Sequence, residues 1–120
     1  MTLNTVEEIL RDTARELREH PERWCKLYFA TRNDCTATDI GAADAVSWCL
    51  AGHVYRRSPT DSDLMWHIGA LLRETLMRHG HSVKYPYDLV TCWNDKPGRT
   101  VDDVIALCEE AALAARAAAP

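Results

Sequence analysis

The strongest local constraint on the fold lies between Cys92 and Ile105. Pro97-Gly98 suits the two central positions of a type II turn, because proline presets the first position and glycine tolerates the positive φ of the second. Thr100 and Asp103 can then cap a last helix. The residues of this stretch to which we assign a structural role are Trp93, Asn94, Asp95, Pro97, Gly98, Thr100 and Asp103. Together they should set the last helix against the rest of the chain.

Three further helices are predicted from capping residues and from apolar residues that recur at helical spacing. A capping box at Thr5 starts a first helix that ends near Glu19 or His20. The second spans about residues 42–57 and is apolar on most of its circumference, so it is expected to be the central one. The third follows the turn-forming cluster at 58–63, and Gly80 is its expected C-terminal stop.

Two segments between these helices are expected to be extended. Residues 23–30 are rich in aromatic side chains, and residues 89–93 form a short apolar run. The second run could pair with the segment around Leu27, which would join the Trp24 and Trp93 regions in a two-stranded ribbon. Residues 31–41 read as a polar loop. The sequence therefore predicts a mostly α, four-helix single domain over residues 1–120, with a short ribbon and an alanine-rich tail from about residue 113.

Composition and charge exclude several classes of protein. An apolar fraction of 47% and a charged fraction of 27% are typical of a globular chain. The net charge is −4 and the Lys and Arg residues are scattered, so direct nucleic-acid binding is not expected. No run is long and apolar enough to span a membrane and no leader is visible, which favours a cytoplasmic location. Five cysteines without a Cys-x-x-Cys pair indicate reduced thiols.

Several short motifs resemble those of a family of small bacterial and phage proteins that is catalogued as a domain of unknown function. These motifs are Trp24-Cys25, Ala45-Val46-Ser47-Trp48-Cys49-Leu50-Ala51-Gly52, Trp93-Asn94-Asp95, and Pro97-Gly98-Arg99-Thr100 followed by Val104. The likeness runs from about Thr5 to about Ala112. It implies a compact domain common in phages and mobile elements, with no activity attached. Where such relatives tend to have a small residue three positions after the first Trp, this chain has Leu27.

Cys49 and His53 are the best candidates for chemistry, because they stand four residues apart on a predicted helix. The pair could be metal ligands, or a thiol nucleophile and its base, with Asn94 or Asp95 as the orienting group. The alternative is a buried thiol beside a hydrogen-bonded histidine, which we favour because no further ligands form a recognisable array. We expect no metal and no cofactor. A small thiol- or metal-dependent enzyme remains the alternative function.

Two aromatic strips on the middle helices are the predicted binding surfaces. Tryptophan, tyrosine and arginine are enriched at the hot spots of protein interfaces. The residues of the two strips are Trp66, Met77 and Arg73 in one, and Trp48, Tyr55 and Arg56 in the other. The sequence thus favours a non-catalytic protein that binds another protein, or a second copy of itself as a homodimer. By analogy with the resembling family, it could be a phage- or prophage-derived accessory protein or an inhibitor of a host defence complex, such as an anti-CRISPR.

Overall fold

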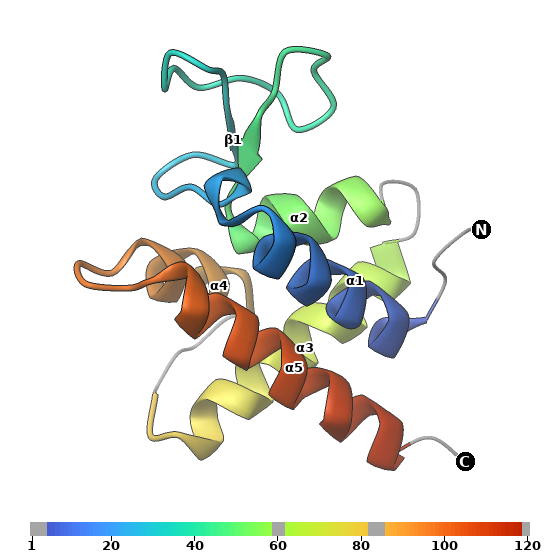
Figure 1. The fold of residues 1–120 in the computed structure, drawn as a ribbon. Coiled ribbons are helices and arrows are strands. Elements are labelled where there is room, and N and C mark those ends of the chain that lie inside the picture. Colours follow the sequence, from blue (N-terminus) through green and yellow to red (C-terminus); the bar gives the residue numbers. More distant parts are fainter. Residues whose placement is uncertain (1–4, 59–61, 82–85, 119–120) are drawn as a thin grey trace.

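The computed structural model describes residues 5–58, 62–81 and 86–118. Its described part is mostly helical, with one two-stranded antiparallel ribbon (Figure 1). The elements in chain order are α1 (Val6–Glu19), the 3-10 turn η1 (Pro21–Arg23), β1 (Ala30–Thr31), β2 (Ser47–Trp48), α2 (Leu50–Arg57), α3 (Ser62–Arg78), α4 (Pro86–Asp95) and α5 (Val101–Ala118). This confirms the mostly α fold class and the presence of a ribbon. None of the described helices is long and apolar enough to cross a membrane.

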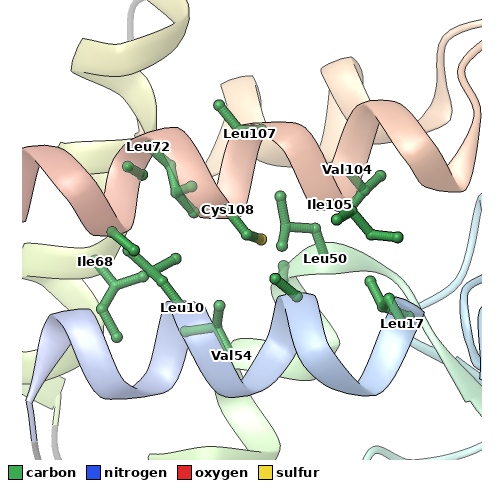
Figure 2. Close-up of a cluster of buried hydrophobic side chains, with 14 of the residues drawn as sticks. Leu10, Leu17, Leu50, Val54, Ile68, Leu72, Val104, Ile105, Leu107 and Cys108 are labelled. Carbon is green, nitrogen blue, oxygen red and sulfur yellow. The ribbon is translucent and has the colours of Figure 1, made fainter. Parts of the chain in front are cut away.

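The core lies between α1 and α5, which run antiparallel, and is closed by α2 and α3 (Figure 1). Figure 2 shows side chains from all four helices meeting in one cluster, with Leu10 and Leu17 of α1 facing Cys108 and Ile105 of α5. The apolar stripe predicted for the first helix is therefore the face that is buried. Cys108 is fully buried, and this burial raises the pKa of its thiol to about 12. None of the five cysteines is in a disulfide.

The helix ends follow the capping chemistry of the sequence. The Thr5 hydroxyl accepts from the amide of Glu8, and Thr100 and Asp103 exchange reciprocal side-chain hydrogen bonds at the start of α5. Gly98 has a φ of 86°, as the second central position of a type II turn requires, and the amide of Arg99 closes that turn on the carbonyl of Lys96.

The C-terminal stop of α3 is likewise confirmed. Gly80 has a φ of 86°, and the amide of His81 returns to the carbonyl of Leu76. This is the bond pattern with which a glycine in the left-handed conformation ends a helix.

The predicted position of the ribbon was wrong. β1 pairs with β2 in the register Ala30 with Trp48 and Thr31 with Ser47, so the Trp93 segment takes no part. The Trp24 region contributes only a single parallel bridge to Trp48. The expected extended segment 23–30 begins with η1 and becomes a strand only at its last residue.

The second helix is shorter than predicted. Residues 42–46 are irregular, Ser47–Trp48 form strand β2, and the helix begins only at Leu50. Small residues such as Ala42 and Ala45 favour a helix locally, yet propensity is a weak preference that tertiary pairing overrides. Here the amide of Val46 donates to the carbonyl of Thr31, and that bond holds the segment against β1.

The run at residues 89–93 is part of helix α4 rather than a strand, and Asn94 and Asp95 are its last residues rather than a turn. A short apolar run does not distinguish a strand from a buried piece of helix. Pro86 occupies the first position of α4, where proline is well tolerated because no intrahelical amide bond is lost.

Gly52 of α2 lies against the backbone of the loop that precedes β1. A Cβ atom at this position would lie 2.2 Å from the carbonyl oxygen of Phe29. We expect Gly52→Ala to lower the free energy of unfolding by about 1–3 kcal/mol, because backbone atoms have to move apart. Gly41→Ala is the matched control, since a Cβ there meets nothing within 4 Å. Equal chemical denaturation midpoints for the two variants would contradict this close packing.

Candidate functional site

The loop between η1 and β1 presents the largest group of exposed apolar side chains among the described residues. Leu27 is 72% exposed, and Tyr28 and Phe29 are 47% and 48% exposed. Val46, which precedes β2, is 42% exposed, and it lines the same open groove as Tyr28. We call these four residues the apolar loop surface. Single exposed apolar residues are common, but a contiguous exposed group marks an interaction site.

The backbone of this loop is strained at its tip. Leu27 has a φ of 74°, in the left-handed region that a branched side chain disfavours. Such a conformation costs about 1–2 kcal/mol for a residue with a Cβ. It persists only where the surrounding structure enforces it, and strain of this kind concentrates at functional sites.

Asn94 is the centre of the polar network that holds the loop. Its side chain is fully buried. The amide oxygen accepts from the indole Nε1 of Trp24 at 2.6 Å and from the amide of Leu50 at 3.1 Å. The amide nitrogen donates to the carbonyl of Cys25 at 3.1 Å and to Oδ1 of Asp95 at 3.0 Å. Every donor and acceptor of this side chain is used, so one residue joins α4, the start of α2 and the loop.

Asp95 extends this network to the strained tip. Its Oδ1 atom accepts from the backbone amide of Leu27 at 2.8 Å. Next to it, the Lys26 ammonium donates to the carbonyl of Lys96 at 3.0 Å and lies 5.6 Å from the centre of the Trp24 ring. Asp95 at the end of α4 and Lys96 after it therefore bind Leu27 and Lys26 at the loop tip. The side chains of residues 27–29 remain exposed.

Arg99 holds Trp93 in place through two contacts. Trp93 is 7% exposed, and the guanidinium of Arg99 stacks 4.1 Å from the centre of its ring. The same Arg99 donates to the carbonyl of Trp93 at 2.9 Å. Trp93 is thus an anchor, as the sequence predicts, and Arg99 fixes the turn behind it.

A second polar cluster lies under the other end of α2 and is centred on Glu16. Its carboxylate accepts from Arg23 and Arg56 at 3.0 Å each and forms a closer bond to Arg57. The Nδ1 atom of His53 lies 3.5 Å from the same carboxylate, and its Nε2 donates to the carbonyl of Arg23 at 2.8 Å. The cluster ties α1 to η1 and α2.

The charges in this cluster shift two pKa values downward. The His53 ring and the guanidinium groups of Arg57 and Arg56 hold the pKa of Glu16 well below its usual value of 4.5, against the opposing effect of burial. Burial lowers the pKa of His53, although its bonds to Glu16 and to the Arg23 carbonyl oppose this shift. The cluster is therefore a carboxylate held by three arginines beside a buried imidazole.

The Cys49 and His53 pair does not have the environment of a catalytic dyad. Cys49 is 4% exposed and is the N-cap of α2, where its sulfur accepts from the amide of Gly52. Burial raises the pKa of this thiol to about 11, so it is protonated at neutral pH. Asn94, one of the two expected orienting groups, has no hydrogen-bonding capacity left for the pair. Across the residues that the structure describes, no three His, Cys, Asp or Glu side chains are grouped to hold a metal ion.

An open groove beside the apolar loop surface contains a further thiol. Cys25 lines it together with Thr31 and Ser47, whose hydroxyls are hydrogen-bonded to each other. Burial raises the pKa of Cys25, and hydrogen bonds from the two hydroxyl groups oppose this only in part. This thiol is therefore also a weak nucleophile at neutral pH.

The two aromatic strips that the sequence predicts differ in their exposure to solvent. Trp66 and Met77 of α3 are 56% and 47% exposed. Trp48, in contrast, is 8% exposed, and its ring is covered by the guanidinium of Arg56 at 3.8 Å. Tyr55 packs edge to face against Phe29, with ring centres 6.2 Å apart. The Trp48 strip is therefore mostly used inside the fold, while the Trp66 strip faces outward.

Sequence reasoning missed the apolar loop surface. Residues 27–29 are bulky and consecutive, and they were interpreted as part of a strand. Their consecutive positions could have indicated exposure. Only alternate residues of a strand can be buried against one face, so three large apolar residues in a row leave at least one of them exposed. What the sequence could not show is the left-handed conformation at Leu27, whose amide donates to Asp95.

The comparison with known families gives one match. A family model described as "Family of unknown function (DUF6197)" matches residues 1–114. No curated protein and no solved structure matches the sequence.

Proposed function

We propose that this chain, which belongs to the family of unknown function DUF6197, is a non-catalytic protein that binds another protein through its apolar loop surface. The observation that carries the proposal is the strained and exposed tip at Leu27, held from behind by the buried Asn94 and the half-buried Asp95. Such a chain would act as an accessory subunit or an inhibitor of its partner.

The chemistry of this surface indicates what the partner must offer. Leu27, Tyr28 and Phe29 are consecutive exposed side chains, so the partner needs an apolar surface that covers them. A loop fixed before binding loses little conformational entropy when it docks, which favours affinity. The bonds from Asn94 and Asp95 supply that fixation.

Catalysis finds less support in the same region. An enzyme needs convergent groups whose protonation suits neutral pH. Burial raises the pKa of both Cys25 and Cys49, and His53 is fully buried with its Nε2 bonded to a backbone carbonyl. We therefore prefer the binding function to the thiol-dependent enzyme.

Leu27→Gly should separate binding from folding. Glycine adopts the observed φ without steric strain, and little buried surface is lost, so we expect the free energy of unfolding to stay level or rise by up to about 1 kcal/mol. The same change removes the most exposed apolar side chain of the surface, so partner retention should fall by about tenfold or more. Unfolding with urea and quantitative affinity purification from the native cells measure the two effects.

Leu113→Ala is the matched control for this experiment. Leu113 is 59% exposed but lies on α5, away from the loop. The proposal requires a partner that wild type and Leu113→Ala retain equally and that Leu27→Gly loses. If every specific partner is retained by Leu27→Gly, the apolar loop surface is not the binding site.

A further inference from the structure

The outward face of α3 carries a second strip that the loop surface does not use. Its members are spaced by four, three and four residues, which places them on one face of a helix: Trp66, Ala70, Arg73 and Met77. Trp66 and Met77, at the two ends, are exposed, and Ala70 in the middle would let another helix approach closely. Alternating intervals of three and four residues are the pattern of helices that pack along each other.

A row of charged and titratable residues runs beside this strip. It consists of Asp63, His67, Glu74 and Arg78, all of them exposed. Glu74 and Arg78 have the spacing of an intrahelical ion pair, yet no ion pair within the described part of the chain includes any of the four. The acid at the start of the row and the base at its end are therefore available to another molecule.

The strip and the charged row of one α3 complement those of a second α3 that runs in the opposite direction. If two α3 helices lie antiparallel, Trp66 of one copy meets Met77 of the other. In the same arrangement Asp63 lies near the second copy's Arg78, and His67 lies near the second copy's Glu74. A parallel arrangement would instead place Asp63 beside Asp63 and Arg78 beside Arg78, which like charges disfavour.

From this complementarity we propose that α3 is a self-association surface, which pairs with α3 of a second copy in an antiparallel, two-fold arrangement. A two-fold interface brings the same patch of both subunits together, as this row of charges requires. The helix has 17 residues, so the contact extends over about 25 Å. One helix face is smaller than the usual interface of a stable dimer, so the association is weak and depends on concentration.

Sedimentation equilibrium of the purified chain over a wide concentration range tests this pairing. The average mass should rise from 13.6 kDa toward twice that value. Trp66→Ala should raise the dissociation constant by about tenfold or more. Leu113→Ala, an exposed apolar change on α5, should leave it unchanged. A chain that remains monomeric at every concentration overturns the proposal.

Charge reversal tests the antiparallel orientation. Asp63→Arg and Arg78→Asp should each weaken the dimer, because each brings like charges together, and the double variant should restore it. Both residues are exposed, so each variant is expected to keep the wild-type circular dichroism spectrum, with a small decrease in thermal midpoint because each charge is reversed at an end of α3. A double variant that is as weak as the singles overturns the antiparallel arrangement. These outcomes are independent of the loop surface, which Leu27→Gly tests.

Discussion

Asn94→Ala is expected to destabilise the protein by about 3–5 kcal/mol, the largest effect of any single hydrogen-bonding residue of the loop network. The change leaves the Trp24 indole and the Leu50 amide without their acceptor, and the Cys25 carbonyl without its donor. Buried polar groups that lose their partners cost more than a hydrogen bond contributes when it forms. Urea unfolding followed by tryptophan fluorescence measures the loss.

Cys92→Ala is the control for this experiment. Cys92 is on the same helix α4 but is exposed, so its replacement should change stability by less than about 0.5 kcal/mol. Asn94→Asp provides a second comparison, since it keeps the acceptor for Trp24 and loses the donor to Cys25. A loss of under about 1 kcal/mol for Asn94→Ala would mean that the loop is held by other contacts.

Glu16→Gln should cost about 3–5 kcal/mol at neutral pH, because it removes the one carboxylate that Arg23, Arg56 and Arg57 share. The side chain of Arg57 is 10% exposed and that of Glu16 is 11% exposed, so solvent compensates little for the lost partner. Arg57 keeps its bond to Asp12 at 2.8 Å, which limits the loss. Thermal unfolding at pH 7 gives the difference.

The same variant has a characteristic pH dependence. In the folded state the pKa of Glu16 lies below the value of 4.5 that applies to the unfolded chain, so folding favours the deprotonated carboxylate. Its contribution is complete above that value and is lost as the pH falls below it. The stabilities of wild type and Glu16→Gln should therefore converge as the pH is lowered from 5. A constant difference across that range would rule out the charge of Glu16 as the cause.

Glu7→Gln is the matched control for the charge effect. Glu7 pairs with Arg11 on the solvent side of α1, with 29% of its side chain exposed. Exposed pairs of this kind contribute about 0.3–0.5 kcal/mol. The difference between the two variants isolates the effect of sharing one carboxylate among three arginines.

Local chemistry made much of the helical framework predictable. The cap at Thr5, the turn at Pro97-Gly98 and the stop at Gly80 depend on residues within one helical turn of each other, and all three are in the structure. The apolar stripes of α1 and α5 were also readable, because periodicity shows which face is buried. The sequence alone therefore determined the fold class and most helix ends.

Contacts between distant residues decided the rest. β1 pairs with β2, which is separate from it in the sequence. The amide of Val46 donates to the carbonyl of Thr31, although Val46 lies in a segment that was predicted to be helical. Asn94 reaches partners that are 70 and 44 residues away, at Trp24 and Leu50. No local pattern encodes such distances, because hydrogen-bond geometry depends on where separate elements meet.

The candidate sites divide in the same way. Trp66 and Met77 could be named from their helical spacing, because one helix suffices to place both on one face. The apolar loop surface could not, because Leu27 has a left-handed conformation and its amide bonds to the carboxylate of Asp95, 68 residues away. The sequence determined which residues are apolar and where α1 and α5 begin, and the tertiary structure alone decided which of those apolar residues stay outside.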